Sequence, residues 1–405
     1  MKIFTTTLGV ALLATAANVS GAFAATDLHM IMCGDDTTPG IAVQQTLIDE
    51  WTAANPDYAV DIEFVPWGQC QEKSMTLAAA GNPASLAYLG SRTLKQLAKN
   101  DLIIPVSLTD EEAESYAAPI LGTVTWEGQQ WGMPRAFSSK ALWYNKGLFA
   151  AAGLDPETPP TTWDELLAAA KAITENTDAA GYGMAGASFD NTMHQFMTVM
   201  YSNGGEVINA DGEIVFGSDN NVEALAFVEA LVPYSEPGPI AYDRGKLEIL
   251  FGEEKVGMLI DGHWLKGRIS EDLDAGVVPF PAGPMGKSSS LLITDSLAVF
   301  KDSGVEDAAL SLAKYLTSPE HQMAFDIAEG YTPIRTGPEV DALIDADATW
   351  APFINVIPDG GPEPFVTDYV AMQDVLNEAL QGVILGEVDA AEAVEYAAEE
   401  LEAVK

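Results

Sequence analysis

Apolar runs alternate with amphipathic stretches along residues 28–105. Strands are predicted at the apolar or alternating runs, residues 28–32, 60–65 and 85–89. Helices are predicted at the amphipathic stretches, residues 43–53, 72–80 and 94–99. Strands that alternate with helices form a parallel sheet with helices on both faces, so the pattern predicts an α/β fold. Ligands of such sheets bind outside the carboxyl ends of the strands, where the polar loops after each run would lie.

A change of pattern at residues 131–174 marks where the chain passes from one lobe to a second. Residues 141–144 predict a strand, and a turn leads into a short helix at residues 148–152. A proline-rich loop then brings Thr161 or Thr162 into position to cap the next helix. Two acidic residues follow in the first turn of that helix, where the helix dipole favours negative charge.

A second series of strands and helices follows residue 180. Strands are predicted at residues 181–185, 256–260, 277–283 and 297–300. Helices are predicted at residues 191–201, 222–232, 308–316, 319–328, 365–382 and 390–404.

The N-terminus is predicted to be an export signal. Lys2 precedes an apolar run at residues 8–17, and the small-x-small sequence Ala22-Phe-Ala24 follows. We therefore expect residues 1–24 to be a signal peptide that is removed near Ala25. No later apolar run reaches the roughly 18 residues of a membrane span, and no cysteine stands at the cleavage point to carry a lipid. The predicted location is the periplasm or the surrounding medium.

The chain is strongly acidic. It contains 60 Asp and Glu against 19 Lys and Arg, a net charge of −41, which argues against nucleic acid or an anionic membrane surface as a partner. No glycine-rich phosphate loop follows the first predicted strand, so no nucleotide cofactor is predicted. The four histidines lack the spacing of a zinc site, and no G-x-S-x-G motif is present. Carboxylates are too frequent for their pairing to exclude a glycosidase.

Cys33 and Cys70 are the only two cysteines. An even number of cysteines in an oxidising compartment favours a disulfide, and each residue follows a predicted strand. If the two strands are parallel neighbours, both sulfurs lie near one edge of the sheet. A bridge of this loop size would add about 3–4.5 kcal/mol of stability. A cysteine nucleophile or a metal pair is the weaker alternative, because His29 is the only histidine nearby in sequence.

Four stretches, taken in order, resemble a known family. Residues 144–166 contain YNK, LF, AAGL and TTWDEL, and residues 251–264 read FGEEKVGMLIDGHW. Residues 278–284 read VPFPAGP, and residues 313–335 contain AKYLTSPE and GYTPIR. The order and content of these motifs resemble the extracellular solute-binding proteins of ABC importers, the maltose-binding-protein-like sugar group. The resemblance covers nearly the whole mature chain.

The resemblance implies two α/β lobes, each a mostly parallel sheet flanked by helices, joined by a hinge of crossing strands that closes on a ligand. Residues 25–135 with 290–337 would form the first lobe, and residues 136–289 with 338–405 the second. The implied protein is a monomeric periplasmic receptor without cofactor, which captures a small carbohydrate and delivers it to a membrane permease. An exported carbohydrate-active enzyme is the contrasting hypothesis.

Departures from the family pattern fall at the expected ligand loops. Pro83-Ala84 and Gly90-Ser91-Arg92 stand where members often carry acidic residues, and Thr294-Asp295-Ser296 stands where many have paired glycines. The substrate therefore cannot be copied from the maltose or oligosaccharide members. An anionic sugar derivative, a polyol or an osmolyte glycoside remains as an alternative ligand.

Aromatic and polar residues near predicted strand ends are candidate ligand contacts. An aromatic ring suits the apolar face of a sugar, and Trp67, Trp143, Trp264 and Trp350 lie at strand ends or near the hinge. Sugar hydroxyls need planar polar partners. Candidates of this kind are Asp35, Asp36, Thr37, Gln69, Ser91, Gly186, Ser188, Gly205 and Asp295.

Two arginines and one histidine complete the candidate set. A guanidinium binds a hydroxyl pair or an anionic group in a bidentate manner. Arg92 follows a predicted strand, and Arg335 lies in a loop that matches the family pattern. Arg335 has a salt bridge to the other lobe as its alternative role. If Arg92 faces the cleft, an anionic sugar becomes the better ligand. His263 either contacts the ligand or supports Trp264.

Overall fold

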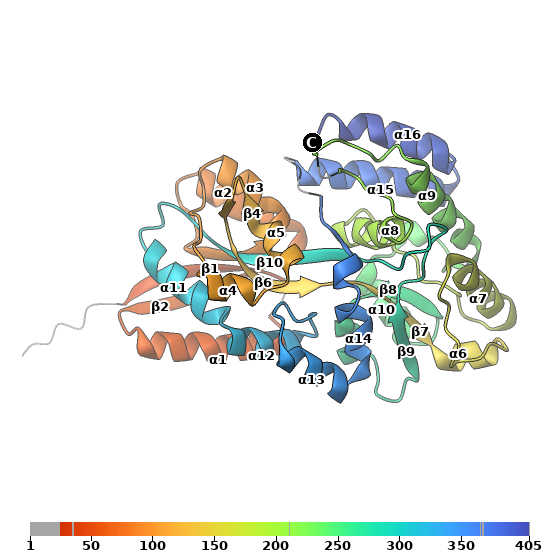
Figure 1. Cartoon of the computed structure of the whole chain (residues 1–405), viewed down its shortest axis with the longest axis horizontal. Coiled ribbons are helices and arrows are strands. Elements are labelled where there is room, and N and C mark those ends of the chain that lie inside the picture. Colours follow the sequence, from red (N-terminus) through yellow and green to blue (C-terminus); the bar gives the residue numbers. More distant parts are fainter. Residues whose placement is uncertain (1–24, 35, 210, 365, 367, 405) are drawn as a thin grey trace, which may run out of the picture.

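The computed structural model describes residues 25–404 apart from residues 35, 210, 365 and 367 (Figure 1). The predicted signal peptide and Asp35 therefore lie outside the described residues. Two α/β lobes lie side by side, the first built mainly from the N-terminal part of the chain and the second from its middle and C-terminal parts (Figure 1). The predicted two-lobed α/β fold is confirmed.

A six-stranded sheet forms the centre of the first lobe, in the order β11-β10-β3-β1-β2 with β6 also paired to β10. Strands β1 to β3 are parallel, as predicted, whereas β10 is antiparallel to both β3 and β6. Met30, Ile31 and Met32 of β1 are all buried because helices cover both faces of the parallel strands. The strand bounds are β1 Thr26–Cys33, β2 Tyr58–Val65, β3 Leu86–Gly90, β6 Met133–Ser138, β10 Leu291–Val299 and β11 Gly361–Pro362.

Helices surround this sheet, and a small hairpin between Trp126 and Trp131 lies beside it. Leu47, Ile48 and Trp51 form the buried stripe of α1, at the spacing that predicted the helix. The bounds are α1 Pro39–Ala54, α2 Trp67–Ala79, α3 Leu94–Lys99, α4 Asp110–Glu114, α5 Ala118–Val124, β4 Thr125–Trp126, β5 Gln129–Gln130, α11 Glu306–Leu316 and α12 Pro319–Glu329, and α13 Pro338–Ala346 begins the C-terminal segment that follows.

The second lobe contains a three-stranded sheet in the order β8-β7-β9. Here β7 is antiparallel to both neighbours, so the expectation of mostly parallel strands does not describe these three. The reason is that β7 arrives across the hinge, so its first residue, Ala141, pairs with the last residue of β8, Asp261. The predicted strand at residues 181–185 contributes only isolated bridges. The strand bounds are β7 Ala141–Asn145, β8 Met258–Asp261 and β9 Ala275–Pro279.

Helices pack around this second sheet and form the larger hydrophobic core of the protein. The α-helices are α6 Lys146–Ala151, α7 Trp163–Asn176, α8 Asp190–Ser202, α9 Asp219–Leu231, α10 Arg244–Gly252, α14 Ala351–Ile354, α15 Tyr369–Leu385 and α16 Ala390–Leu401. Short 3-10 helices are η1 Ser91–Thr93, η2 Val232–Tyr234, η3 Pro239–Ala241, η4 His263–Gly267, η5 Ala348–Trp350 and η6 Ile357–Asp359.

Two paired strands cross between the lobes. Strand β10 is longer than predicted: Leu291 and Ile293 pack in the second core, while residues 297–299 pack in the first. Strand β6 pairs with it and continues through Ser139 and Lys140 into β7. We propose on this basis that the lobe boundaries lie where the sequence placed them, at residues 135/136, 289/290 and 337/338.

The capped helix predicted after the proline-rich loop is α7. The Thr162 hydroxyl accepts a hydrogen bond from the Glu165 backbone N–H at 3.3 Å, and the Glu165 carboxylate accepts one from the Thr162 N–H at 3.2 Å. This reciprocal arrangement is a capping box. Trp163 then stacks on Phe227 with ring centroids 4.4 Å apart, which fixes α7 against α9. Of the two caps that the sequence allowed, Thr161 and Thr162, the structure has Thr162.

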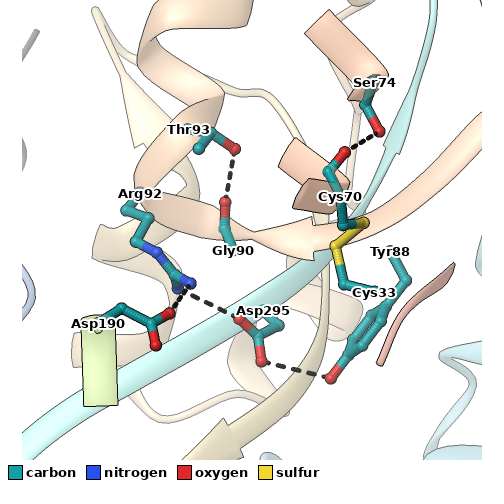
Figure 2. The surroundings of a disulfide bond; sticks show 9 residues. All are labelled: Cys33, Cys70, Ser74, Tyr88, Gly90, Arg92, Thr93, Asp190 and Asp295. Atoms are coloured by element: carbon teal, nitrogen blue, oxygen red, sulfur yellow. Dashed lines mark hydrogen bonds and ion pairs between the residues drawn. A yellow bond between two sulfur atoms is a disulfide. The ribbon is translucent and has the colours of Figure 1, made fainter. Parts of the chain in front are cut away.

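A disulfide joins Cys33 to Cys70 with their Cα atoms 5.4 Å apart, as predicted (Figure 2). Cys33 is the last residue of β1, and Cys70 lies in the first turn of α2, directly after β2. Because β1 and β2 are parallel neighbours, both residues lie at the carboxyl edge of the sheet. The bridge therefore fixes the edge at which ligands of α/β sheets bind.

Candidate functional site

A cavity of about 230 Å³ lies between the two lobes. The first lobe lines it with residues that follow the carboxyl ends of β1, β2 and β3, namely Gly34, Trp67 and Arg92. The second lobe contributes residues from the starts of α8 and α10 and from η4, namely Asp190, Arg244 and Trp264. Aromatic rings and charged groups therefore converge from both lobes, which is the character of a small-molecule site.

Arg92 lines the cavity and pairs with Asp190 and Asp295 (Figure 2). Its Nη2 lies 3.1 Å from Asp190 Oδ2, and its Nη1 lies 3.5 Å from both Asp295 Oδ1 and Glu363 Oε1. The Arg92 side chain is only 2% exposed. We call Arg92, Asp190, Asp295 and Glu363 the arginine cluster. Gly90 is required beside it, because a Cβ at that position would overlap the guanidinium.

The arginine cluster carries more negative than positive charge. Burial opposes the charge on Arg92, but the surrounding carboxylates outweigh it and raise the Arg92 pKa above its ordinary value. Burial likewise opposes ionisation of Glu363, yet Arg92 and His194 lower its pKa overall. For Asp295 burial dominates over Arg92 and raises the pKa to about 7. Near neutral pH the Asp295 carboxyl is therefore able to donate a hydrogen bond as well as to accept one.

A second charged group of residues lines the cavity around Trp264. Lys140 Nζ lies 4.1 Å and Arg244 Cζ 4.9 Å from the centre of the Trp264 ring. Gly262 leaves room for this ring, since a Cβ there would overlap it. The Trp264 Nε1–H donates to Glu248 Oε1 at 3.2 Å.

Two carboxylates face three cations in this region. Arg244 lies 3.3 Å from Glu248 and 3.8 Å from Asp261, and Arg268 lies 2.7 Å from Glu248. Lys140 is the third cation and is 2% exposed. Burial lowers the pKa of Lys140 and raises that of Asp261, so each group is less readily charged than in water. We call Lys140, Arg244, Glu248, Asp261 and Arg268 the lysine cluster.

A second cavity, of about 600 Å³, lies on the other side of Arg92. Arg92 lines both spaces, and Glu363 and Gly205 line only this second one. Its volume is larger, but it lacks the tryptophans and the lysine cluster among its described lining residues. The smaller cavity is therefore the better candidate for a ligand site.

The profile of a family described as bacterial extracellular solute-binding protein matches residues 34–323. The chain belongs to this family.

Individual relatives agree with this assignment. A binding protein of Brucella abortus (strain 2308) is 29% identical over 343 residues, which are 82% of this chain and 82% of that protein. The diacetylchitobiose binding protein DasA of Streptomyces coelicolor is 22% identical over 303 residues, 70% of each chain. The structure of an ABC transporter solute-binding protein from Thermotoga lettingae TMO, bound with alpha-D-tagatose, superposes with a TM-score of 0.82 at 25% identity, covering 93% of this chain and 99% of that one.

The solute-binding fold brings some of the predicted site residues together. Trp67, Arg92, Trp264 and Asp295 all line the smaller cavity. Ser91 and Gly205 line the larger one instead, and the Ser91 hydroxyl is bonded to that of Ser296 at 2.5 Å. Trp67, Ser91 and Arg92 follow β2 and β3 at the predicted edge of the first sheet, whereas Asp295 lies within β10, Gly205 after α8 and Trp264 in η4 of the second lobe.

The other predicted residues lie elsewhere in the described structure. Asp36, Thr37, Gln69 and Ser188 are exposed outside both cavities, and Gly186 is buried beside Pro239. Trp143, His263 and Arg335 are buried in packing roles. The Trp143 Nε1–H donates to the Gly262 carbonyl at 3.0 Å, and His263 stacks on Trp350 at 3.5 Å. Arg335 donates to Ser115 and to the Thr317 carbonyl, and its guanidinium lies 3.6 Å from the Tyr116 ring.

Several cavity residues of this solute-binding protein were not anticipated from the sequence. Lys140, Asp190 and Arg244 are the principal ones, each outside the loops that follow predicted strands of the first lobe. The scarcity of arginine in the sequence could have pointed to two further cavity residues, Arg244 and Arg268. Of the five arginines in the sequence, Arg92, Arg244 and Arg268 line this cavity.

Within the described ranges no group of three or more His, Cys, Asp or Glu side chains has an arrangement that could hold a metal ion. Over the same residues, no helix has the length and apolar character needed to cross a membrane.

Proposed function

We propose that this solute-binding protein is a receptor that captures a small carbohydrate between its lobes and delivers it to the membrane permease of an ABC importer. The observation that carries the proposal is the interlobe cavity, where Trp67 offers a half-buried ring beside the charged groups of both lobes. An aromatic face with a polar rim suits a sugar ring and its hydroxyls. The tagatose-bound structure and the diacetylchitobiose binding protein described above support a sugar as the ligand class.

The proposed mechanism is a shift of population toward the closed form. A ligand that contacts both lobes stabilises the closed arrangement by the difference between its affinities for the two states. Arg92 of the first lobe already contacts Asp190 of the second, so the closed arrangement has its own charged contact beside the ligand. No bond of the ligand is made or broken in this mechanism. The protein is further proposed to be exported by its signal peptide and to act as a monomer in the periplasm.

A thermal-shift screen with monosaccharides, disaccharides and polyols tests the proposal. A ligand present at 100 times its Kd adds about 2.7 kcal/mol of stability, which raises the Tm measurably. Trp67→Ala is expected to weaken binding at least ten-fold, a loss of about 1.4 kcal/mol or more. Trp126→Ala, in the hairpin away from both cavities, is the matched control and should bind normally. Product formation from a bound sugar, detected by mass spectrometry with turnover, would overturn the receptor role.

A further inference from the structure

Two clusters of opposite net charge contribute to the lining of the interlobe cavity. In the lysine cluster three cations face two carboxylates. In the arginine cluster one guanidinium faces three carboxylates. The cavity lining therefore includes a group of residues with excess positive charge around Trp264, and the two carboxylates Asp190 and Asp295 beside Arg92.

The part of the lining around Trp264 holds a buried cation that forms no direct salt bridge. Among the described residues, no carboxylate lies within salt-bridge distance of Lys140, and its ammonium lies 4.1 Å from the centre of the Trp264 ring, while Asp261 and Glu248 act on it only through their electrostatic fields. The Nε of Arg244 is also buried and without a hydrogen-bond partner in that part of the chain. Burying a charge is costly unless an opposite charge or hydrogen bonds compensate it. Both side chains line the cavity, so an anionic group of a ligand has access to them.

The lysine cluster has a net charge of +1, because it contains three cations and two carboxylates. If Lys140 and Asp261 are both ionised, their charges cancel, and if Lys140 passes its proton to Asp261, both become neutral. In either state Arg244 and Arg268 face Glu248, which leaves a single positive charge. A monoanion such as a carboxylate neutralises this charge, whereas the dianion of a phosphate ester would leave an excess of negative charge in a buried site.

The part of the cavity lining that contains Asp190 and Asp295 is suited to bind hydroxyl groups of a ligand. Asp295 Oδ1 is buried and accepts no hydrogen bond from the described residues, and Asp295 and Asp190 both line the cavity. A sugar hydroxyl donates to a carboxylate, and such a charge-assisted hydrogen bond is about twice as strong as a neutral one. The volume of about 230 Å³ is below the roughly 300–1,000 Å³ of most ligand pockets, which favours a single sugar unit.

From these contacts we infer that the ligand is an acidic monosaccharide, a sugar of the uronic- or aldonic-acid class, whose carboxylate binds Lys140 and Arg244 while its hydroxyls bind Asp190 and Asp295. This assignment rests on the proposed receptor function and specifies its substrate class. In this assignment the lysine cluster, and not Arg92, binds the anionic group, because the carboxylates around Arg92 already neutralise its charge.

The test is calorimetric titration of the full mature protein with hexuronates and aldonates, with the matched neutral hexoses and hexitols, and with hexose 6-phosphates. We expect an acidic sugar to bind at least ten-fold more tightly than its neutral counterpart and than its phosphate counterpart. Lys140→Met is expected to weaken binding of the acidic sugar about 10–100-fold and to leave that of the neutral counterpart within about two-fold, as for a lost charged hydrogen bond. Lys140→Arg keeps the charge and should retain most of the affinity.

Controls separate this inference from the receptor function. Lys266→Met removes an exposed lysine of the same lobe that pairs with Asp347, and it should leave all affinities unchanged. Equal or tighter binding of a neutral sugar, or preference for a phosphate, would overturn the acidic-sugar assignment and leave the receptor function standing. Absence of binding for every sugar, with normal unfolding of the protein, would overturn both.

Discussion

A buried glutamate of the second lobe makes the stability of the protein depend on pH. Glu236 is 4% exposed, and its Oε2 accepts a hydrogen bond from the Met184 N–H at 3.1 Å. Its Oε1 has no hydrogen-bond partner among the described residues. Burial raises the pKa of Glu236 from 4.5 to about 7, although the hydrogen bond from Met184 opposes this shift. The folded protein therefore binds this proton more tightly than the unfolded chain does.

The sign and size of the effect follow from linkage. Because the folded-state pKa is the higher one, stability falls as pH rises from about 4.5 to about 7, and the full penalty applies above that range. At about 1.4 kcal/mol per pKa unit, the penalty is about 3 kcal/mol. Glu236→Gln stays neutral at every pH and keeps an acceptor for Met184. The variant should therefore gain up to about 3 kcal/mol over the natural protein at pH 8 and almost nothing at pH 4.5.

Urea unfolding at pH 5, 6, 7 and 8 measures this difference directly, since the midpoint and slope give the free energy of unfolding. Glu229→Gln, at an exposed position of α9, is the matched control and should give curves that follow the natural protein. The reasoning is refuted if the free-energy gain of Glu236→Gln is the same at pH 5 as at pH 8.

Three further changes test the fold and the interlobe contact. Replacing Cys33 and Cys70 by alanine opens a loop whose ends are 37 residues apart, and should cost about 4 kcal/mol in urea unfolding; a loss below 1 kcal/mol would contradict the loop-entropy argument. Arg92→Met leaves three carboxylates without their cation and should cost about 3–5 kcal/mol and increase the radius of gyration in X-ray scattering; unchanged scattering would show that Arg92 does not hold the lobes together. Thr162→Ala removes the cap of α7 and should cost about 1 kcal/mol in thermal unfolding, so an unchanged Tm would rule out the cap as a source of stability.

The elements that the sequence predicted well are those whose signal is local. The cap at Thr162 needs only residues three apart, and the stripe of α1 needs only its own periodicity. The disulfide was predictable because two parallel strands each end beside a cysteine. Strand direction in the second lobe was not, because β7 pairs with strands more than a hundred residues away and its direction depends on the hinge crossing.

In the candidate site, too, local signals in the sequence were informative and long-range packing was not predictable. Trp67 and Arg92 were found because they directly follow strands whose carboxyl ends meet at one edge. Arg335 and His263 have the right residue types, but long-range packing against Tyr116 and Trp350 determines where their side chains lie. Lys140 was missed because nothing in its neighbours in sequence shows that it is buried beside the Trp264 ring.

The position of Lys140 connects ligand charge with closure. It lies in the segment between β6 and β7, where the chain crosses from one lobe to the other, while Arg244 belongs to the second lobe and Asp295 to the crossing strand β10. In this structure these groups line one cavity together with Trp67 of the first lobe. We therefore propose that a ligand with both an acid group and hydroxyls gains its full set of contacts only when both lobes surround it, which is the differential affinity that a population shift requires. The net charge of −41 does not oppose this anion, because the local excess of cations around Trp264 acts at a few ångströms, where the distant carboxylates are screened.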